Sequence, residues 1–123
     1  MPRTKRAVVH SPICRAELFE SAEAAWFWFA RCQTLRYEGA RFDRFANDVE
    51  RPCDPDDIYR VLMQLRRSGL LGPQHVAVLV RFGAALRPPD PRHTAETHAA
   101  RLWDEALDRL TTPLRVKGIV KID

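Results

Sequence analysis

The amino-acid sequence predicts an all-α protein, built as a compact single-domain bundle of four to five helices. Apolar residues recur at three- and four-residue steps in several segments, which is the period of an amphipathic helix. Residues that cap or end helices flank those segments, and proline or glycine separates them. With 123 residues and 46% hydrophobic side chains, the chain suits one domain with its own apolar core.

The composition divides the chain into three parts. Residues 1–12 are expected to form a flexible basic arm that carries Arg3, Lys5 and Arg6. The helical domain is expected over residues 13–115, and a short tail over residues 116–123. The tail sequence fits a short helix as well as an extended strand against the core, and the pattern leaves both open.

Two helices in the first half have marked ends. Ser21 is expected to cap a helix that runs to about Tyr37 and stops before Gly39. Asp54 is expected to cap the next helix, with Pro55 at its first position. The buried stripe of that second helix is expected to comprise Ile58, Val61, Leu62 and Leu65. Gly69 is expected to end the helix.

A third helix is expected after Gly72-Pro73, although the valines of this segment also fit a buried strand. The proline start and the helical neighbours favour the helix. Its common face is expected to hold Val76, Leu79, Val80 and Gly83.

The fourth helix is expected from Thr94, as its N-cap, to Leu110 or a little beyond. Pro113 should end or kink it, because proline lacks the N–H that an internal helical turn needs. The apolar stripe of this helix comprises Ala95, Ala99, Leu102, Ala106 and Leu110, widened by Trp103 and Leu107.

Four successive aromatic residues, at positions 26–29, lie in the first helix. Successive helical residues point about 100° apart, so one face cannot bury all four. The helix is therefore expected to be central and covered on most sides, with Trp26 and either Phe29 or Ala30 toward the core. Trp28 is the aromatic residue expected to face a partner protein.

The net charge of +4 and the isoelectric point near 9.3 favour a polyanionic partner such as DNA. Cys14, Cys32 and Cys53 form no CxxC pair and leave an odd thiol, which favours a reducing cytoplasm. No apolar run reaches the length of a membrane span, so no membrane partner is expected.

Catalytic and metal-binding motifs are missing from the sequence. It contains no GxGxxG, Walker, GxSxG or HExxH motif, so we expect no enzyme and no cofactor. His93 and His98 would lie about 140° apart on a helix and cannot share a metal. The carboxylates at positions 54–57 are explained by helix capping, and no metal site is expected.

The last third of the chain carries a family resemblance. Residues 78–83, Val-Leu-Val-Arg-Phe-Gly, and residues 102–115, with Ala106, Leu107, Leu110 and Pro113 spaced after Trp103, resemble region 4 of sigma-70 factors. The similarity covers about 40 residues, approximately positions 73–115. The chain also resembles small sigma-like activators or antiterminators of the kind found in phages and gene transfer agents.

The resemblance implies a transcription regulator that binds bacterial RNA polymerase and contacts promoter DNA, with a second protein subunit as a further expected partner. Region 4 places the start of its last long helix in the major groove of DNA. Carried over to this chain, the DNA-contacting residues are Arg92, His93, Thr94, Thr97, His98 and Arg101. Apart from the resemblance, the basic arm is expected to add contacts to DNA through Arg3, Lys5 and Arg6.

The chain departs from the region 4 pattern between Gly83 and Trp103. Only 19 residues, rich in proline, stand where region 4 has the first helix and turn of its helix-turn-helix. The motif is therefore expected to be degenerate, with the supporting helix reduced to a loop. Two other classes stay open: a phage-type packaging or architectural DNA-binding protein, and an interaction module that contacts only proteins.

Overall fold

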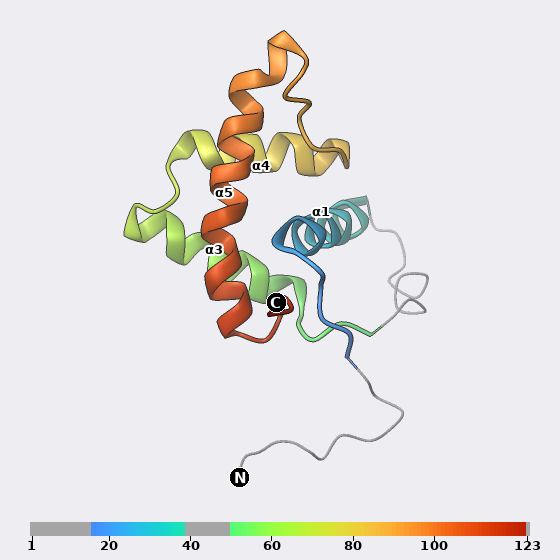
Figure 1. Cartoon of the computed structure of the whole chain (residues 1–123). Coiled ribbons are helices and arrows are strands. Elements are labelled where there is room, and N and C mark those ends of the chain that lie inside the picture. Colours follow the sequence, from blue (N-terminus) through green and yellow to red (C-terminus); the bar gives the residue numbers. More distant parts are fainter. Residues whose placement is uncertain (1–15, 39–49, 123) are drawn as a thin grey trace.

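The computed structural model describes residues 16–38 and 50–122, and every regular element in these ranges is a helix (Figure 1). The elements are α1 Ala22–Glu38, α3 Pro55–Ser68, α4 Pro73–Ala85, the short 3-10 helix η1 Thr94–Glu96 and α5 Thr97–Val116. The predicted all-α class is confirmed. Helix α5 packs against α1, α3 and α4, while α1 also packs against α3 and α4. None of the described helices is long and apolar enough to cross a membrane.

Helix α1 is central, as its aromatic run predicts. Its N-cap is confirmed, because the Ser21 hydroxyl oxygen accepts a hydrogen bond from the Ala24 N–H at 3.1 Å. Trp26 and Phe29 are buried, whereas Phe27 and Trp28 are half-buried against the same core. Three neighbouring helices thus cover a helix whose apolar residues point in almost every direction.

Helix α3 begins and ends where the sequence predicts. The Asp57 carboxylate accepts a hydrogen bond from the Asp54 N–H at 2.9 Å, and Pro55 opens the helix. Gly69 ends it with φ +84°, a left-handed conformation that glycine adopts most easily. The four predicted stripe residues are the buried ones, Ile58, Val61, Leu62 and Leu65.

The segment with the valines is a helix, α4, so the predicted third helix is confirmed. Its buried face differs from the expected one, since Val80 is 57% exposed and Phe82 takes its place beside Leu79 and Gly83. The reason is that α4 packs against both α1 and α5, which turns Phe82 toward Trp103.

Helix α5 differs from the prediction at both ends. Thr94 opens a 3-10 turn, and the α-helix itself begins at Thr97. Pro113 was expected to end or kink the helix; it does not end it, because the helix continues to Val116. Proline removes one backbone hydrogen bond, but its fixed φ is helical, and the burial of Leu110 and Leu114 on either side holds the helix together.

The buried stripe of α5 is also shifted from the expected one. Ala95 is exposed, and Ala99, Leu102 and Leu107 are only partly buried. Contact with three helices moves the buried face to Ala100, Trp103, Ala106, Leu110 and Leu114.

The C-terminal tail is extended and completes the core. Val120 forms a parallel β-bridge with Phe19, and the Phe19 backbone exchanges 2.9 Å hydrogen bonds with Ile119 and Lys121. Ile119 and Val120 are buried. Of the two forms that the sequence left open, the tail therefore adopts the extended one, and two of its residues belong to the apolar core.

Cys32 and Cys53 are free thiols. Burial raises the pKa of the Cys32 thiol to about 11, and burial together with Asp57 and Asp54 raises that of Cys53 to about 12. Both therefore stay protonated at neutral pH and are poor nucleophiles. Cys14 lies outside the described residues.

Candidate nucleic-acid interface

The predicted DNA-contacting residues of the last third of the chain lie in and directly after the loop that joins α4 to α5. Residues 86–93 contain no helix, so this stretch is a loop. Leu86 turns the chain out of α4 with φ +57°, and its N–H bonds the Gly83 carbonyl at 3.1 Å. Pro88, Pro89 and Pro91 restrict the backbone that follows, and Pro89 is buried.

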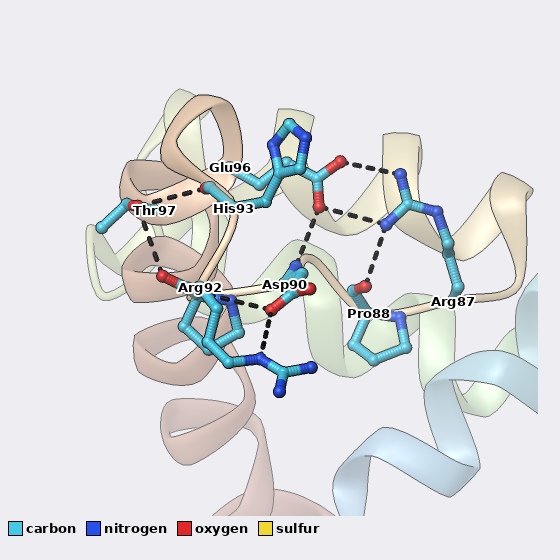
Figure 2. A network of polar contacts seen from close by, with 8 residues as sticks. Arg87, Pro88, Asp90, Arg92, His93, Glu96 and Thr97 are labelled. Atoms are coloured by element: carbon cyan, nitrogen blue, oxygen red, sulfur yellow. Dashed lines mark hydrogen bonds and ion pairs between the residues drawn. The ribbon is translucent and has the colours of Figure 1, made fainter.

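The Glu96 carboxylate organises this loop (Figure 2). Arg87 donates to both of its oxygens, at 3.1 and 2.7 Å, and the Asp90 N–H donates to Oε1 at 2.8 Å. The Glu96 side chain is only 15% exposed. The Arg87 hydrogen bonds, followed by that of the Asp90 N–H, hold the pKa of Glu96 at about 2. A charged anchor therefore ties the end of α4 to the start of α5.

Thr97 supports the loop from inside the helix. Its hydroxyl lies 3.3 Å from the Pro91 carbonyl and 3.2 Å from the His93 carbonyl, and it donates its single proton to one of them at a time. The His93 N–H bonds the Asp90 carbonyl, and the Glu96 N–H bonds that of His93. The structure therefore gives Thr97, a predicted DNA contact, a hydrogen bond within the loop.

The other predicted contacts in this region are exposed together. Arg92, His93 and Thr94 lie at the tip of the loop and in η1, and His98 and Arg101 follow on the first two turns of α5. In the described part of the chain, the N–H groups of Thr94 and Ala95 have no backbone acceptor. Such free N–H groups, with the positive end of the helix dipole, favour an anion.

The charge changes sign along α5. Residues 87–101 hold three arginines and two carboxylates, an excess of one positive charge, and both carboxylates are already bound by Arg87 and Arg92. Residues 102–110 hold three carboxylates and one arginine, an excess of two negative charges. Only the loop and the first two turns of α5 therefore present a surface suited to DNA.

One of these later carboxylates, Glu105, belongs to a second polar cluster. It lies 2.9 Å from Nε2 of His75, whose Nδ1 accepts a hydrogen bond from the Gly72 N–H at 3.1 Å. Because Nδ1 is an acceptor, Nε2 carries the proton of the neutral ring and donates to Glu105. This cluster holds the start of α4 against α5 and lies outside the loop network.

Three of the remaining predicted site residues, Arg3, Lys5 and Arg6, lie outside the described residues. The fourth, Trp28, is not brought to this surface. Trp28 is half-buried with its ring 5.2 Å from that of Phe19, whose bridge partner Val120 follows the C-terminal end of α5. Through these contacts Trp28 lies toward the C-terminal end of α5, whereas the loop precedes its N-terminal end.

The supporting residues Arg87, Asp90 and Glu96 were not predicted from sequence. Their only signal is the alternation of opposite charges in and after a proline-rich stretch, with Arg87, Asp90, Arg92 and Glu96 in that order. A loop has no fixed period, so charge spacing cannot show which side chains meet across it.

An apolar groove opens elsewhere, between α1, α3 and α4. Trp26, Phe29 and Leu79 line it, with the exposed Tyr59 and Val80 at its edge, and it encloses about 290 Å³. In the described ranges, no group of three potential metal-binding side chains is close enough to hold an ion.

Comparison with protein-family models, with curated proteins and with solved structures finds no match to this chain.

Proposed function

We propose that this protein is a transcription regulator that binds RNA polymerase in the cytoplasm and contacts promoter DNA through the α4–α5 loop and the start of α5. The observation that carries the proposal is the joint exposure of Arg92, His93, Thr94, His98 and Arg101 on a rigid loop and helix start. The contact with polymerase is supported by the resemblance to sigma region 4.

The chemistry of this surface suits a nucleic acid. Arg92 and Arg101 supply charged donors for phosphate oxygens or base edges, and the free N–H groups of Thr94 and Ala95 suit a phosphate. The loop anchor matters because donors held in place lose less conformational entropy on binding.

The size of the surface explains why a polymerase partner belongs to the proposal. Asp104, Glu105 and Asp108 repel phosphate along the rest of α5, so few contacts to DNA form. A few exposed donors give weak, salt-sensitive binding. Binding to polymerase would raise the local concentration of DNA at this surface and compensate for that weakness.

Affinity purification of the full chain from its own host, at low salt, tests the polymerase contact. We expect RNA polymerase subunits to co-purify, and their absence would remove the central part of the proposal. The double variant Arg92→Ala, Arg101→Ala should still co-purify but lose the DNA footprint of the complex. Arg60→Ala, Arg66→Ala is the matched control, because both arginines are exposed on α3, and its footprint should be unchanged.

The two alternatives are distinguished by salt and by assembly state. A module that binds only proteins, for which the groove beside Tyr59 and Val80 is the fitting feature, should not bind DNA at any salt concentration. A packaging or architectural protein should form oligomers, whereas a polymerase accessory should be a monomer in the absence of polymerase and bind DNA only weakly, at low salt.

A further inference from the structure

The Asp90 side chain holds Arg92 by both its backbone and its side chain. Oδ1 of Asp90 accepts a hydrogen bond from the Arg92 N–H at 2.9 Å and lies 3.4 Å from Nε of the same arginine. Figure 2 shows the other two guanidinium nitrogens pointing away from the loop. The Arg92 side chain is 89% exposed, so that outer edge is open to a partner.

Asp90 is itself held in position from both sides. Its N–H donates to Glu96, which Arg87 binds in turn, and its carbonyl accepts from the His93 N–H at 3.1 Å. Proline precedes and follows it in the sequence, which restricts the backbone further. The carboxylate therefore reaches Arg92 from a fixed backbone.

This ion pair contributes little to folding stability, because both partners are exposed and the Nε contact is long. Its effect is to fix the direction in which the guanidinium group of Arg92 points. A guanidinium held through Nε presents its two terminal nitrogens side by side in one plane. That fork matches two adjacent acceptors, such as two oxygens of one phosphate or O6 and N7 of a guanine.

We propose that Asp90 is a positioning residue for Arg92, and that the outer edge of Arg92 binds a pair of adjacent acceptors on DNA. The inference rests on the proposed function, because it assumes that this surface meets DNA. It has an unusual consequence: a carboxylate on a DNA-facing surface strengthens binding.

Whether Asp90→Ala weakens or tightens DNA binding tests this proposal. In a fluorescence anisotropy titration of the full chain with a short mixed-sequence duplex at low salt, Arg92→Ala should weaken binding about tenfold or more. Asp90→Ala should weaken it about two- to threefold, which is a third to a half of the free-energy change of a tenfold loss. Simple charge repulsion predicts the opposite, tighter binding by Asp90→Ala, and that result would overturn the inference.

Three further variants separate positioning from a structural role. In the Arg92→Ala background, Asp90→Ala should have no further effect, and an equal loss in both backgrounds would contradict action through Arg92. Asp90→Asn keeps an acceptor oxygen and should recover most of the affinity. Asp104→Ala, the matched exposed carboxylate on α5, should leave binding unchanged or tighten it. Thermal unfolding of each variant confirms that it folds.

A second duplex, built only from A·T pairs, identifies the acceptors. If Arg92 binds phosphate, Arg92→Ala weakens both duplexes equally, and if it binds guanine, only the mixed-sequence duplex is affected. Equal affinity of wild type and Arg92→Ala for both duplexes overturns the inference. If Arg101→Ala also leaves the affinity for both duplexes unchanged, the proposed DNA surface fails as well. If Arg92→Ala weakens DNA binding but Asp90→Ala does not, only the positioning role of Asp90 is removed.

Discussion

At the scale of single residues, Trp26 and Gly83 pack closely where α1 crosses α4. The indole Nε1 donates to the Leu79 carbonyl at 2.9 Å, which brings α1 directly against α4. A β-carbon at Gly83 would lie 2.8 Å from Nε1 and 3.3 Å from Cβ of Ala30. Glycine is therefore required by space here, in the last turn of α4, where alanine would otherwise be preferred.

Gly83→Ala is expected to lower the free energy of unfolding by about 1–3 kcal/mol, because the added methyl group forces the indole or the helix to move. Helix propensity alone predicts a gain of about 1 kcal/mol. Urea unfolding measures whether the substitution lowers or raises the free energy of unfolding. Ala77→Gly, at an exposed position of the same helix, is the control and should lose about 1 kcal/mol through propensity only. A Gly83→Ala protein more stable than wild type would show that the contact is not tight.

At the scale of elements, local signals account for most helix starts. The cap at Ser21, the cap and proline at Asp54-Pro55, and the left-handed Gly69 act within one turn of the residues that they organise, so the sequence predicts them. The outward position of Val80 and the helix beyond Pro113 depend on packing against other helices, which a local pattern does not contain.

The loop before α5 is the element whose stability should depend on pH. A carboxyl group with a lowered pKa stabilises the fold above its unfolded pKa, and this contribution is lost as the pH falls through its folded pKa. For Glu96 these values are 4.5 and about 2. The contribution of the Arg87–Glu96 contact should therefore be complete above about pH 4.5 and decline steadily toward pH 2.

Glu96→Gln tests this expectation. Its free energy of unfolding should lie below that of wild type at neutral pH, and the difference should shrink between pH 4.5 and pH 2. Urea unfolding at a series of pH values measures the difference. The contributions of the other carboxyl groups to the pH dependence cancel in this difference, because both proteins carry those groups. Parallel curves for the two proteins over this range would show that the Glu96 contact does not form.

At the scale of the whole molecule, the two ends of the described chain close the core together. Phe19, before α1, pairs with the tail after α5, and Ile119 is buried beneath this pairing. Contacts of this kind join residues about a hundred positions apart, which explains why the sequence left the form of the tail open. The candidate interface differs, because its contacts are local. Its exposed arginines and histidines were predicted from the resemblance to region 4, but the carboxylates that order the loop, Asp90 and Glu96, were not.

Ile119→Ala is expected to lower the free energy of unfolding by about 2–5 kcal/mol, since it leaves a cavity in the closed core. Ile122→Ala, the same change three residues later, should have almost no effect because Ile122 is 76% exposed. Urea unfolding of both variants measures the contrast. Equal, small losses would mean that the tail does not pack against the core.

The central claim, that the start of α5 meets DNA in a polymerase complex, is tested most directly by site-specific crosslinking. A photoreactive amino acid is placed either at His98, in the first turn of α5, or at Asp108, an exposed position farther along the same helix. Each protein is then irradiated in the complex with RNA polymerase and promoter DNA. We predict a DNA crosslink from position 98 and none from position 108. Crosslinks from position 108 alone, or from neither position, would contradict the account.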